Sequence, residues 1–270
     1  MDIYEILEKL SQMHDVKTDL TVEEMTKEKV DFFNSSVGNL NEVDGYNCDI
    51  CKNKGFIAEY KNGEEVHIYC KCQKTRETLR RAKRSGLGDI LSNFTFDKYE
   101  AADEWQKQIK AKAQAFCKDE KANWFYIGGQ VGAGKTHICT AIAGFYIKKG
   151  YETQYMLWCE ESKKLKAIVN DYTEYQKAIT PYKEAPVLYI DDFLKTRQFE
   201  QPTQADITLA FEIINHRLMS EDKITIISSE KTLTDLLEYD EATMSRIYQQ
   251  AGDYKVMIDK DLSRNYRLRG

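Results

Sequence analysis

Residues 129–136, with the sequence GQVGAGKT, fit the pattern G-x-x-x-x-G-K-[ST] of a phosphate-binding loop. Glycines let such a loop curl so that its backbone N–H groups face a phosphate, and the lysine adds a mobile positive charge. The hydroxyl of Thr136 is suited to bind Mg²⁺, so the loop predicts a site for ATP and Mg²⁺. The residues expected to hold the nucleotide are Gly129, Gln130, Val131, Gly132, Ala133, Gly134, Lys135, Thr136, His137 and Ser229.

A pair of acidic residues follows the apolar run 187–190. A strand of this kind delivers Asp191 to the carboxyl edge of a parallel sheet, where it is predicted to complete the magnesium site with Thr136. Asp192 stands where many ATPases place a glutamate that orients the attacking water, so Lys135, Asp191 and Asp192 are predicted to be catalytic. Such a pair also caps turns, but the phosphate loop favours the catalytic interpretation.

Polar residues also end the run 224–227, which continues as Ser-Ser-Glu at 228–230. If this strand lies between the strands that lead to the phosphate loop and to Asp191, its end approaches the γ-phosphate, and Ser229 is predicted to sense it. In the alternative interpretation, the serine pair caps the helix that begins near Thr232.

Four of the seven cysteines form two close pairs, Cys48-x2-Cys51 and Cys70-x-Cys72, which are 18 residues apart. Two such pairs suit one tetrahedral Zn²⁺ held by four thiolates, a closed and therefore structural site whose metal supplies folding energy to a small module. The second pair is tighter than usual, which leaves His67 as an alternative ligand. Three further cysteines are expected to be small core residues: Cys117, Cys139 and Cys159.

Apolar strand candidates alternate with helical stretches from residue 123 onward. The five expected strands are 124–127, 153–157, 187–190, 224–227 and 255–258. This alternation predicts an α/β fold, in which helices cover both faces of a five-stranded parallel sheet and ligands bind at the carboxyl ends of the strands. Both phosphate-site motifs fall at such ends.

Residues 1–45 are expected to form short helices. Apolar residues recur at helical spacing from Ile3 to Leu10, and Thr21 with Glu24 forms a capping box ahead of a second helix. This segment carries eleven acidic and four basic side chains, whereas residues 71–84 carry seven basic and one acidic. The segregation indicates an acidic face for a protein partner and a basic face for an anion such as nucleic acid, although solvated helices give the same pattern.

The composition, with 42% apolar and 31% charged residues, is that of a packed globular protein. No apolar run approaches the roughly 18 residues of a membrane-spanning helix. The first ten residues alternate charged and apolar side chains, unlike a signal peptide. The sequence therefore predicts a cytoplasmic protein without a membrane partner.

The phosphate loop, the Asp191-Asp192 strand, the serine pair and the segment Met244-Ser-Arg-Ile together resemble the DnaC/DnaI family of bacterial helicase loaders, and the Phe94-Thr-Phe96 segment looks like the one that leads into that family's ATPase core. The resemblance covers most of the chain. It implies an AAA+ ATPase that hydrolyses ATP, lacks a C-terminal helical lid and delivers a hexameric replicative helicase of the DnaB type onto single-stranded DNA.

The resemblance also implies roles for particular residues. Arg246 resembles the arginine finger that reaches the γ-phosphate bound by a neighbouring subunit, which implies self-association through the ATP sites in a ring or open spiral. The alternative is a surface arginine on a helix. Relatives usually have an asparagine where Glu230 stands, which puts the sensing role of that strand end in doubt. Three tail residues are candidates for contacts with nucleotide or DNA, and the sequence does not choose between them: Arg264, Arg267 and Arg269. Candidates for DNA contacts are Lys163, Lys164, Lys166 and the basic stretch 74–84.

Three parts are expected along the chain: a helical head at 1–45 that binds a helicase, a zinc module with a basic helix at 46–86, and the AAA+ domain at 87–270. The nearest alternative is an IstB-like ATPase subunit that assists a DNA transposase, because such proteins share the same core. A P-loop kinase is a second alternative, and a zinc-dependent adaptor that binds ATP without turnover is a third.

Overall fold

The structure is a computed structural model that describes residues 21–84, 87–197 and 200–268. The predicted helix between Ile3 and Leu10 lies outside the described residues. The chain divides into two compact units, residues 1–73 and 74–270. The predicted division into three functional parts stays a prediction.

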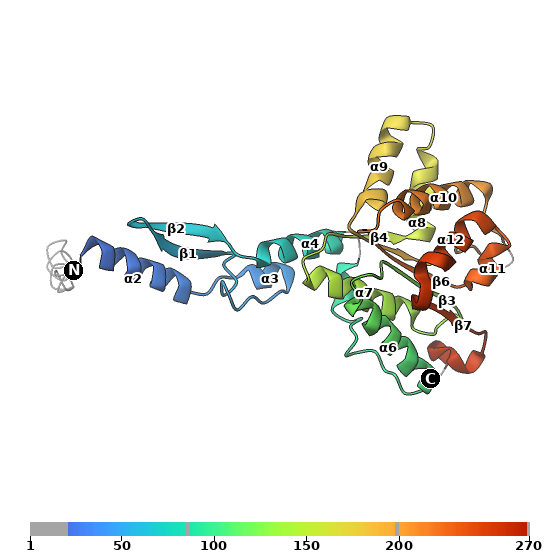
Figure 1. Cartoon of the computed structure of the whole chain (residues 1–270), viewed down its shortest axis with the longest axis horizontal. Helices are drawn as coiled ribbons and strands as arrows, with labels where there is room; N and C mark the ends of the chain where they lie inside the picture. Colours follow the sequence, from blue (N-terminus) through green and yellow to red (C-terminus); the bar gives the residue numbers. More distant parts are fainter. Residues whose placement is uncertain (1–20, 85–86, 198–199, 269–270) are drawn as a thin grey trace, which may run out of the picture. The chain divides into compact units, whose positions relative to one another are not determined.

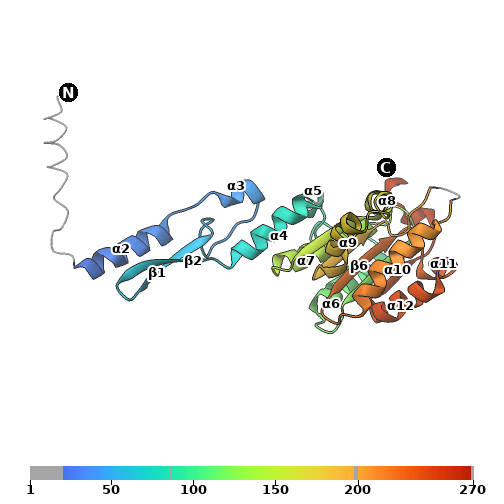
Figure 2. The ribbon, with the colours of Figure 1, turned by 90° about the horizontal axis from the view of Figure 1, so that it is seen from above.

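The first unit is built on a helix and a hairpin (Figure 2). Helix α2 (Val22–Ser35) begins with the predicted capping box, in which Thr21 and Glu24 bond each other's backbone N–H groups. Strands β1 (Phe56–Lys61) and β2 (Glu64–Tyr69) pair antiparallel. The side-chain amide of Asn34 joins α2 to β1, because it accepts from Ala58 N at 3.0 Å and donates to Ala58 O at 2.9 Å.

Two further helices flank the cysteine pairs. Helix α3 (Leu40–Asp44) precedes the first pair and ends at Gly45, whose φ of 72° suits glycine. Helix α4 (Cys72–Arg84) begins at the fourth cysteine. The start of α4 therefore depends on the position of the cysteine cluster.

The second unit contains the predicted five-stranded sheet, and its strand order is β4-β5-β6-β3-β7 with all neighbours parallel. The strands are β3 (Trp124–Gly129), β4 (Thr153–Leu157), β5 (Val187–Asp191), β6 (Ile224–Ser229) and β7 (Lys255–Ile258). The expected position of β6, between the strands that lead to the phosphate loop and to Asp191, is confirmed. Every residue of β3, β5 and β6 is buried, as expected for central strands of a covered parallel sheet.

Helices cover both faces of this sheet (Figure 1). They are α5 (Gly88–Leu91), α6 (Glu104–Lys118), α7 (Lys135–Lys148), α8 (Trp158–Ala167), α9 (Tyr172–Glu184), α10 (Gln204–Leu218), α11 (Leu233–Leu237) and α12 (Glu241–Ala251). Alternate residues of a strand face opposite sides. Accordingly Ile127 packs in one core cluster with α6 and α7, and Tyr126 packs in the other with α10 and α12. Among the described residues, β7 is followed only by short 3-10 turns, Leu262–Arg264 and Tyr266–Leu268.

The three cysteines outside the cluster were expected to be core residues, and the chain was expected to have no membrane-spanning helix. Cys117 and Cys139 are buried as expected, but Cys159, in the first turn of α8, is partly exposed. No helix in the described part of the chain is long and apolar enough to cross a membrane.

Candidate nucleotide site and cysteine cluster

The phosphate loop connects the end of β3 at Gly129 to the start of α7 at Lys135. Gly129 and Gly132 have φ angles of 112° and 74°, which glycine tolerates best. A Cβ atom at Gly129 would lie 1.9 Å from the carbonyl oxygen of Ile258, and one at Gly132 would lie 1.9 Å from Asn265 Oδ1. The first N–H groups of α7 have no acceptor within the helix, so the loop and the helix start offer donors to an anion.

Lys135 is folded back over the loop. Its Nζ donates to the carbonyl oxygens of Gly129 at 2.9 Å and Gln130 at 2.7 Å. Burial lowers the pKa of Lys135. A phosphate would supply the negative charge that this buried ammonium lacks in the loop, which fits the predicted role.

Asp191 ends β5 in a buried position, 4% exposed, and is oriented by hydroxyl groups. Thr136 Oγ1 donates to Asp191 Oδ1 at 3.2 Å, and the hydroxyl of Tyr155 donates to Oδ2 at 3.2 Å. Ser228 also donates to Oδ1. Burial raises the pKa of Asp191. The hydroxyl of Thr136 and the carboxylate of Asp191 are thus side by side, the pair of hard oxygen ligands that Mg²⁺ requires beside a phosphate.

Asp192 adopts a left-handed backbone conformation with φ of 56°. Its N–H group donates to Ser228 Oγ at 3.2 Å, and its Oδ2 lies 2.9 Å from Lys195 Nζ. The same ammonium is 2.8 Å from Glu230 Oε1 at the end of β6. Lys195 was not predicted from the sequence, because nothing in its local pattern separates it from a surface lysine.

The serine pair on β6 supports the turn after β5. Ser229 Oγ donates to Phe193 O at 2.9 Å and accepts from Lys231 N at 3.2 Å. The alternative in which the serine pair caps the following helix is wrong, because Thr232 caps α11 and accepts from Asp235 N at 3.1 Å. A contact of Ser229 with a nucleotide stays a prediction.

A pocket of about 420 Å³ lies over the phosphate loop. Its lining includes Phe94, Lys98, Tyr99, Glu100, Val131, Gly132, Ala133, Gly134, Lys135, Thr136, His137, Asp192, Lys195, Glu230, Tyr266 and Arg267. This volume is in the range of small-molecule sites. Most of the predicted nucleotide residues therefore meet in one pocket.

The segment that leads into the core is fixed by His137. Its ring stacks on Phe94 with centroids 4.8 Å apart, and its Nε2 lies 2.8 Å from Thr95 O. Burial lowers the pKa of His137. A neutral ring suits this apolar contact, so His137 shapes one side of the pocket.

The residues after β7 close the other side of the pocket. Tyr266 N donates to Gly132 O at 3.0 Å, and the side chain of Gln130 accepts from Asp261 N at 2.8 Å. Of the three tail arginines, Arg267 lines the pocket, whereas Arg264 lies over the Trp105 ring. Arg269 lies outside the described residues.

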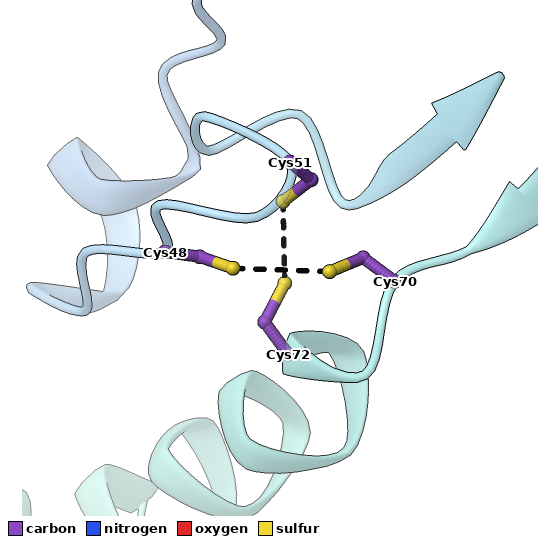
Figure 3. A group of neighbouring side chains, drawn as sticks. All are labelled: Cys48, Cys51, Cys70 and Cys72. Carbon is purple, nitrogen blue, oxygen red and sulfur yellow. Dashed lines mark hydrogen bonds between the residues drawn. The ribbon is translucent and has the colours of Figure 1, made fainter. Parts of the chain in front are cut away.

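The sulfur atoms of Cys48, Cys51, Cys70 and Cys72 lie within 4.8 Å of one another (Figure 3). The Sγ atoms of Cys48 and Cys70 are 3.8 Å apart, and those of Cys51 and Cys72 are 3.5 Å apart. Four thiolates around one Zn²⁺ at about 2.3 Å would be about 3.8 Å apart, so the cluster is compatible with zinc.

The surroundings of Cys51 lower the pKa of its thiol, whereas burial raises the pKa of Cys70. Burial by itself raises the pKa of Cys51, but the N–H of Gly55, 3.2 Å from its Sγ, and the adjacent thiols lower that pKa to about 7. A thiol of this kind is readily deprotonated, as metal binding requires. His67 stands apart from the cluster of four cysteines: its Nε2 lies 2.6 Å from Glu65 Oε1 and its ring contacts Phe33.

Arg246 is exposed on α12, and its Nη1 donates to Asn215 Oδ1 of α10 at 2.6 Å. It is not among the described residues that line the nucleotide pocket of its own chain. This placement accords with the expectation that Arg246 acts elsewhere, but leaves its role a prediction.

The basic residues considered for DNA binding differ in accessibility. On α8, Lys163 and Lys164 are exposed, whereas Lys166 is half-buried and its Nζ lies 2.5 Å from Asp206 Oδ1. In the basic stretch 74–84, Arg76 is fully buried. A DNA strand would therefore have to break the contact of Lys166 with Asp206, and it could not reach the buried Arg76.

Residues 64–246 match the family model described as IstB-like ATP binding protein. The chain belongs to this family. The Bacillus subtilis phage-like element PBSX protein XkdC is 30% identical over 237 residues, which are 83% of this chain and 87% of that protein. The Bacillus subtilis protein YqaM is 31% identical over 216 residues, 74% of this chain and 66% of its own length.

Solved structures share the fold of this ATP-binding family member. The DnaC helicase loader superposes with a TM-score of 0.53 and 22% identity, over 63% of this chain and 98% of that one. DnaI superposes with a TM-score of 0.51 and 22% identity, over 63% of this chain and 92% of that one. AMPPCP-bound DnaA from Aquifex aeolicus superposes with a TM-score of 0.51 and 20% identity. The match covers 65% of this chain and 52% of that DnaA. The second unit therefore has the AAA+ core predicted from the sequence.

Proposed function

We propose that the protein is an ATPase that loads a hexameric replicative helicase of the DnaB type onto single-stranded DNA. The observation that carries the proposal is the pocket over the phosphate loop, whose lining residue Thr136 donates to the buried Asp191, on a fold shared with a structure described as a helicase loader. The pocket supports ATP binding, and the shared fold supports the choice of partner.

In this proposal the chain's own residues divide the chemistry. The loop N–H groups and Lys135 bind the phosphates, while Thr136 and Asp191 would hold Mg²⁺, whose charge would offset that of the phosphates. Asp192 orients the attacking water. Arg246 of one subunit reaches the γ-phosphate bound by its neighbour, which makes the assembly head-to-tail.

In this proposal the first unit binds the helicase and holds a structural zinc. Four buried thiols at tetrahedral spacing would hold Zn²⁺, and the metal would fix the hairpin and the start of α4. Helix α2, which precedes the cluster, and the hairpin between the two cysteine pairs expose apolar side chains, with Phe32 at 77% and Tyr69 at 76%. Exposed aromatics of this kind suit a protein partner.

The proposal is tested with the full chain, the replicative helicase of its host, and circular single-stranded DNA. Size-exclusion chromatography with light scattering should give a complex of the two proteins, and ATP with Mg²⁺ should transfer the helicase to the DNA circle. Lys135→Met should keep the complex and abolish the transfer, because it removes phosphate binding and leaves the first unit unchanged.

The second candidate is an ATPase that assists a DNA transposase, and it is favoured by the match to the IstB-like family model. It predicts no complex with the helicase and, instead, ATP-dependent filaments on duplex DNA. That pair of results in the same experiment would reject the loader.

A further inference from the structure

Lys98 and Lys195 line the nucleotide pocket besides Lys135, and neither has a role in the mechanism above. Lys195 lies in the turn after β5 and lines the pocket with Lys135 and Thr136. Its Nζ is 2.9 Å from Asp192 Oδ2 and 2.8 Å from Glu230 Oε1. One ammonium therefore bridges two carboxylates at the ends of neighbouring strands.

The backbone of this turn is fixed, so that only side chains are left to move. Phe193 N donates to Ser228 O at 2.8 Å, Phe193 O accepts from Ser229, and the ring of Phe193 packs edge-on against Trp158. Leu194 is 1% exposed and has a φ of 53°, an unfavourable conformation that persists because its surroundings enforce it. The Lys195 side chain, by contrast, is 35% exposed.

The charges at this end of the pocket are unbalanced. Burial disfavours the ammonium of Lys195, but its bonds to Asp192 and Glu230 raise its pKa above the ordinary value, so it stays charged at neutral pH. Two carboxylates around one ammonium leave a net negative charge. Since Asp192 is the proposed water-orienting residue, this end meets the terminal phosphate of ATP. Lys135 and Mg²⁺ would attract that phosphate and the carboxylates of Asp192 and Glu230 would oppose it, so an ammonium that turned from these carboxylates to the phosphate would add to the attraction.

We propose that Lys195 is a ligand of the γ-phosphate, which it binds from within the same subunit by exchanging its carboxylate partners for the phosphate oxygens. ADP, which has no γ-phosphate, leaves the bridge to Asp192 and Glu230 in place. The exchange also releases Asp192 to contact water when ATP is bound and not when ADP is bound. This inference rests on the proposed function only in requiring ATP in the pocket, and it needs neither helicase nor DNA.

The test compares affinities for ATP and ADP. The full-length protein, with Mg²⁺, is titrated with a fluorescent non-hydrolysable ATP analogue and with the matching fluorescent ADP. Lys195→Met should weaken ATP binding by about tenfold, the expected loss of one charge-assisted contact, and change ADP binding by less than about twofold. Lys195→Arg keeps the charge and should retain most of the preference for ATP.

Lys223→Met is the matched control, because Lys223 is a half-buried lysine whose Nζ lies 2.7 Å from Glu184 Oε2, outside the residues that line this pocket. It should leave both affinities unchanged. If Lys195→Met weakens ATP and ADP equally and lowers the melting temperature, the lysine only stabilises the turn and the inference is overturned. An unchanged ratio of affinities also overturns it.

The outcome is separable from that of the loading experiment. If the wild-type protein binds neither nucleotide, the ATP site itself fails and the inference with it. A selective loss of ATP binding in Lys195→Met, together with no helicase loading by the wild type, would support the lysine's role and reject the loader.

Discussion

At the scale of single residues, the nucleotide site depends on a carboxylate that is oriented before any metal arrives. Three hydroxyl groups, from Thr136, Tyr155 and Ser228, converge on Asp191. Their hydrogen bonds offset part of the cost of burying a carboxylate, but burial still raises its pKa. The burial of this carboxylate, the proposed magnesium ligand, therefore lowers the stability of the fold.

The sign of the Asp191 pKa shift predicts the behaviour of Asp191→Asn. A pKa raised in the folded state contributes stability at low pH that is lost as pH rises through the folded value. The variant should therefore melt at a higher temperature than the wild type at neutral pH, and the gain should shrink as pH falls toward the ordinary value of 3.8. Thermal denaturation between pH 4 and 8 checks this, and binding of ATP with Mg²⁺ should be lost.

Asp206→Asn is a control of opposite sign. Burial would raise the pKa of Asp206, but Lys166 and Thr203 bond to it and lower its pKa. Such a carboxylate stabilises the fold above its unfolded pKa and loses that contribution as pH falls. The variant should melt lower than the wild type at neutral pH, and equal shifts for both variants would contradict this explanation.

At the scale of elements, one buried arginine joins the helices of one face to the sheet. Arg217 of α10 is fully buried and donates to Tyr182 O at the end of α9, to Ala185 O, and to Ile224 O and Thr225 Oγ1 on β6. Burial lowers its pKa to about 10. These bonds fix where β5 and β6 start, and therefore where their carboxyl ends bring Asp191 and Glu230.

Replacing this arginine should be costly. Arg217→Met leaves several buried carbonyl oxygens without donors, so it should lower the free energy of unfolding by about 3 kcal/mol or more. Urea denaturation followed by circular dichroism measures the change. Arg246→Met, which alters an exposed arginine that bonds Asn215, should cost less than about 1 kcal/mol, and similar losses in both variants would refute the role given to Arg217.

The cysteine cluster gives a second prediction at this scale. Purified protein should contain one Zn²⁺ per chain by elemental analysis, and Cys51→Ser should lose it and the protection of hairpin amides from hydrogen exchange. ATP affinity should change by less than about twofold, because all residues of the nucleotide pocket lie in the second unit. Cys159→Ser is the control and should keep the metal. A wild-type chain without metal would contradict the prediction.

At the scale of the whole molecule, the nucleotide site is expected to be completed by a neighbouring copy. Arg246 lies exposed against Asn215, and the described pocket lining does not include it. An arginine that acts in a neighbouring site would have to be accessible in this way.

Mixing two inactive variants tests this arrangement. Lys135→Met and Arg246→Ala should each lower the ATPase rate by at least about 100-fold. In a head-to-tail assembly, a mixture of the two contains junctions with an intact phosphate loop on one side and an intact Arg246 on the other. The mixture should therefore recover a measurable part of the wild-type rate. A rate equal to the sum of the two variants would exclude the neighbour's arginine.

The sequence by itself determined the features that depend on residues close together in the chain. The glycine spacing of the phosphate loop, the apolar runs of the five strands, the Thr21 capping box and the two cysteine pairs are local patterns, and each corresponds to an element found in the structure. Backbone sterics, capping and strand burial act over a few residues, which is why these patterns can be interpreted without a structure.

Only the tertiary structure decided which distant residues meet. The strand order placed Ser228 and Tyr155 on Asp191 and brought Glu230 to Lys195, and the packing around α4 buried Arg76. The contacts of His67 with Glu65 and Phe33 keep its side chain apart from the four cysteines, although His67 is three residues from Cys70 in the sequence. These contacts follow from sheet topology and side-chain packing across the whole core, and no periodicity along the chain encodes them.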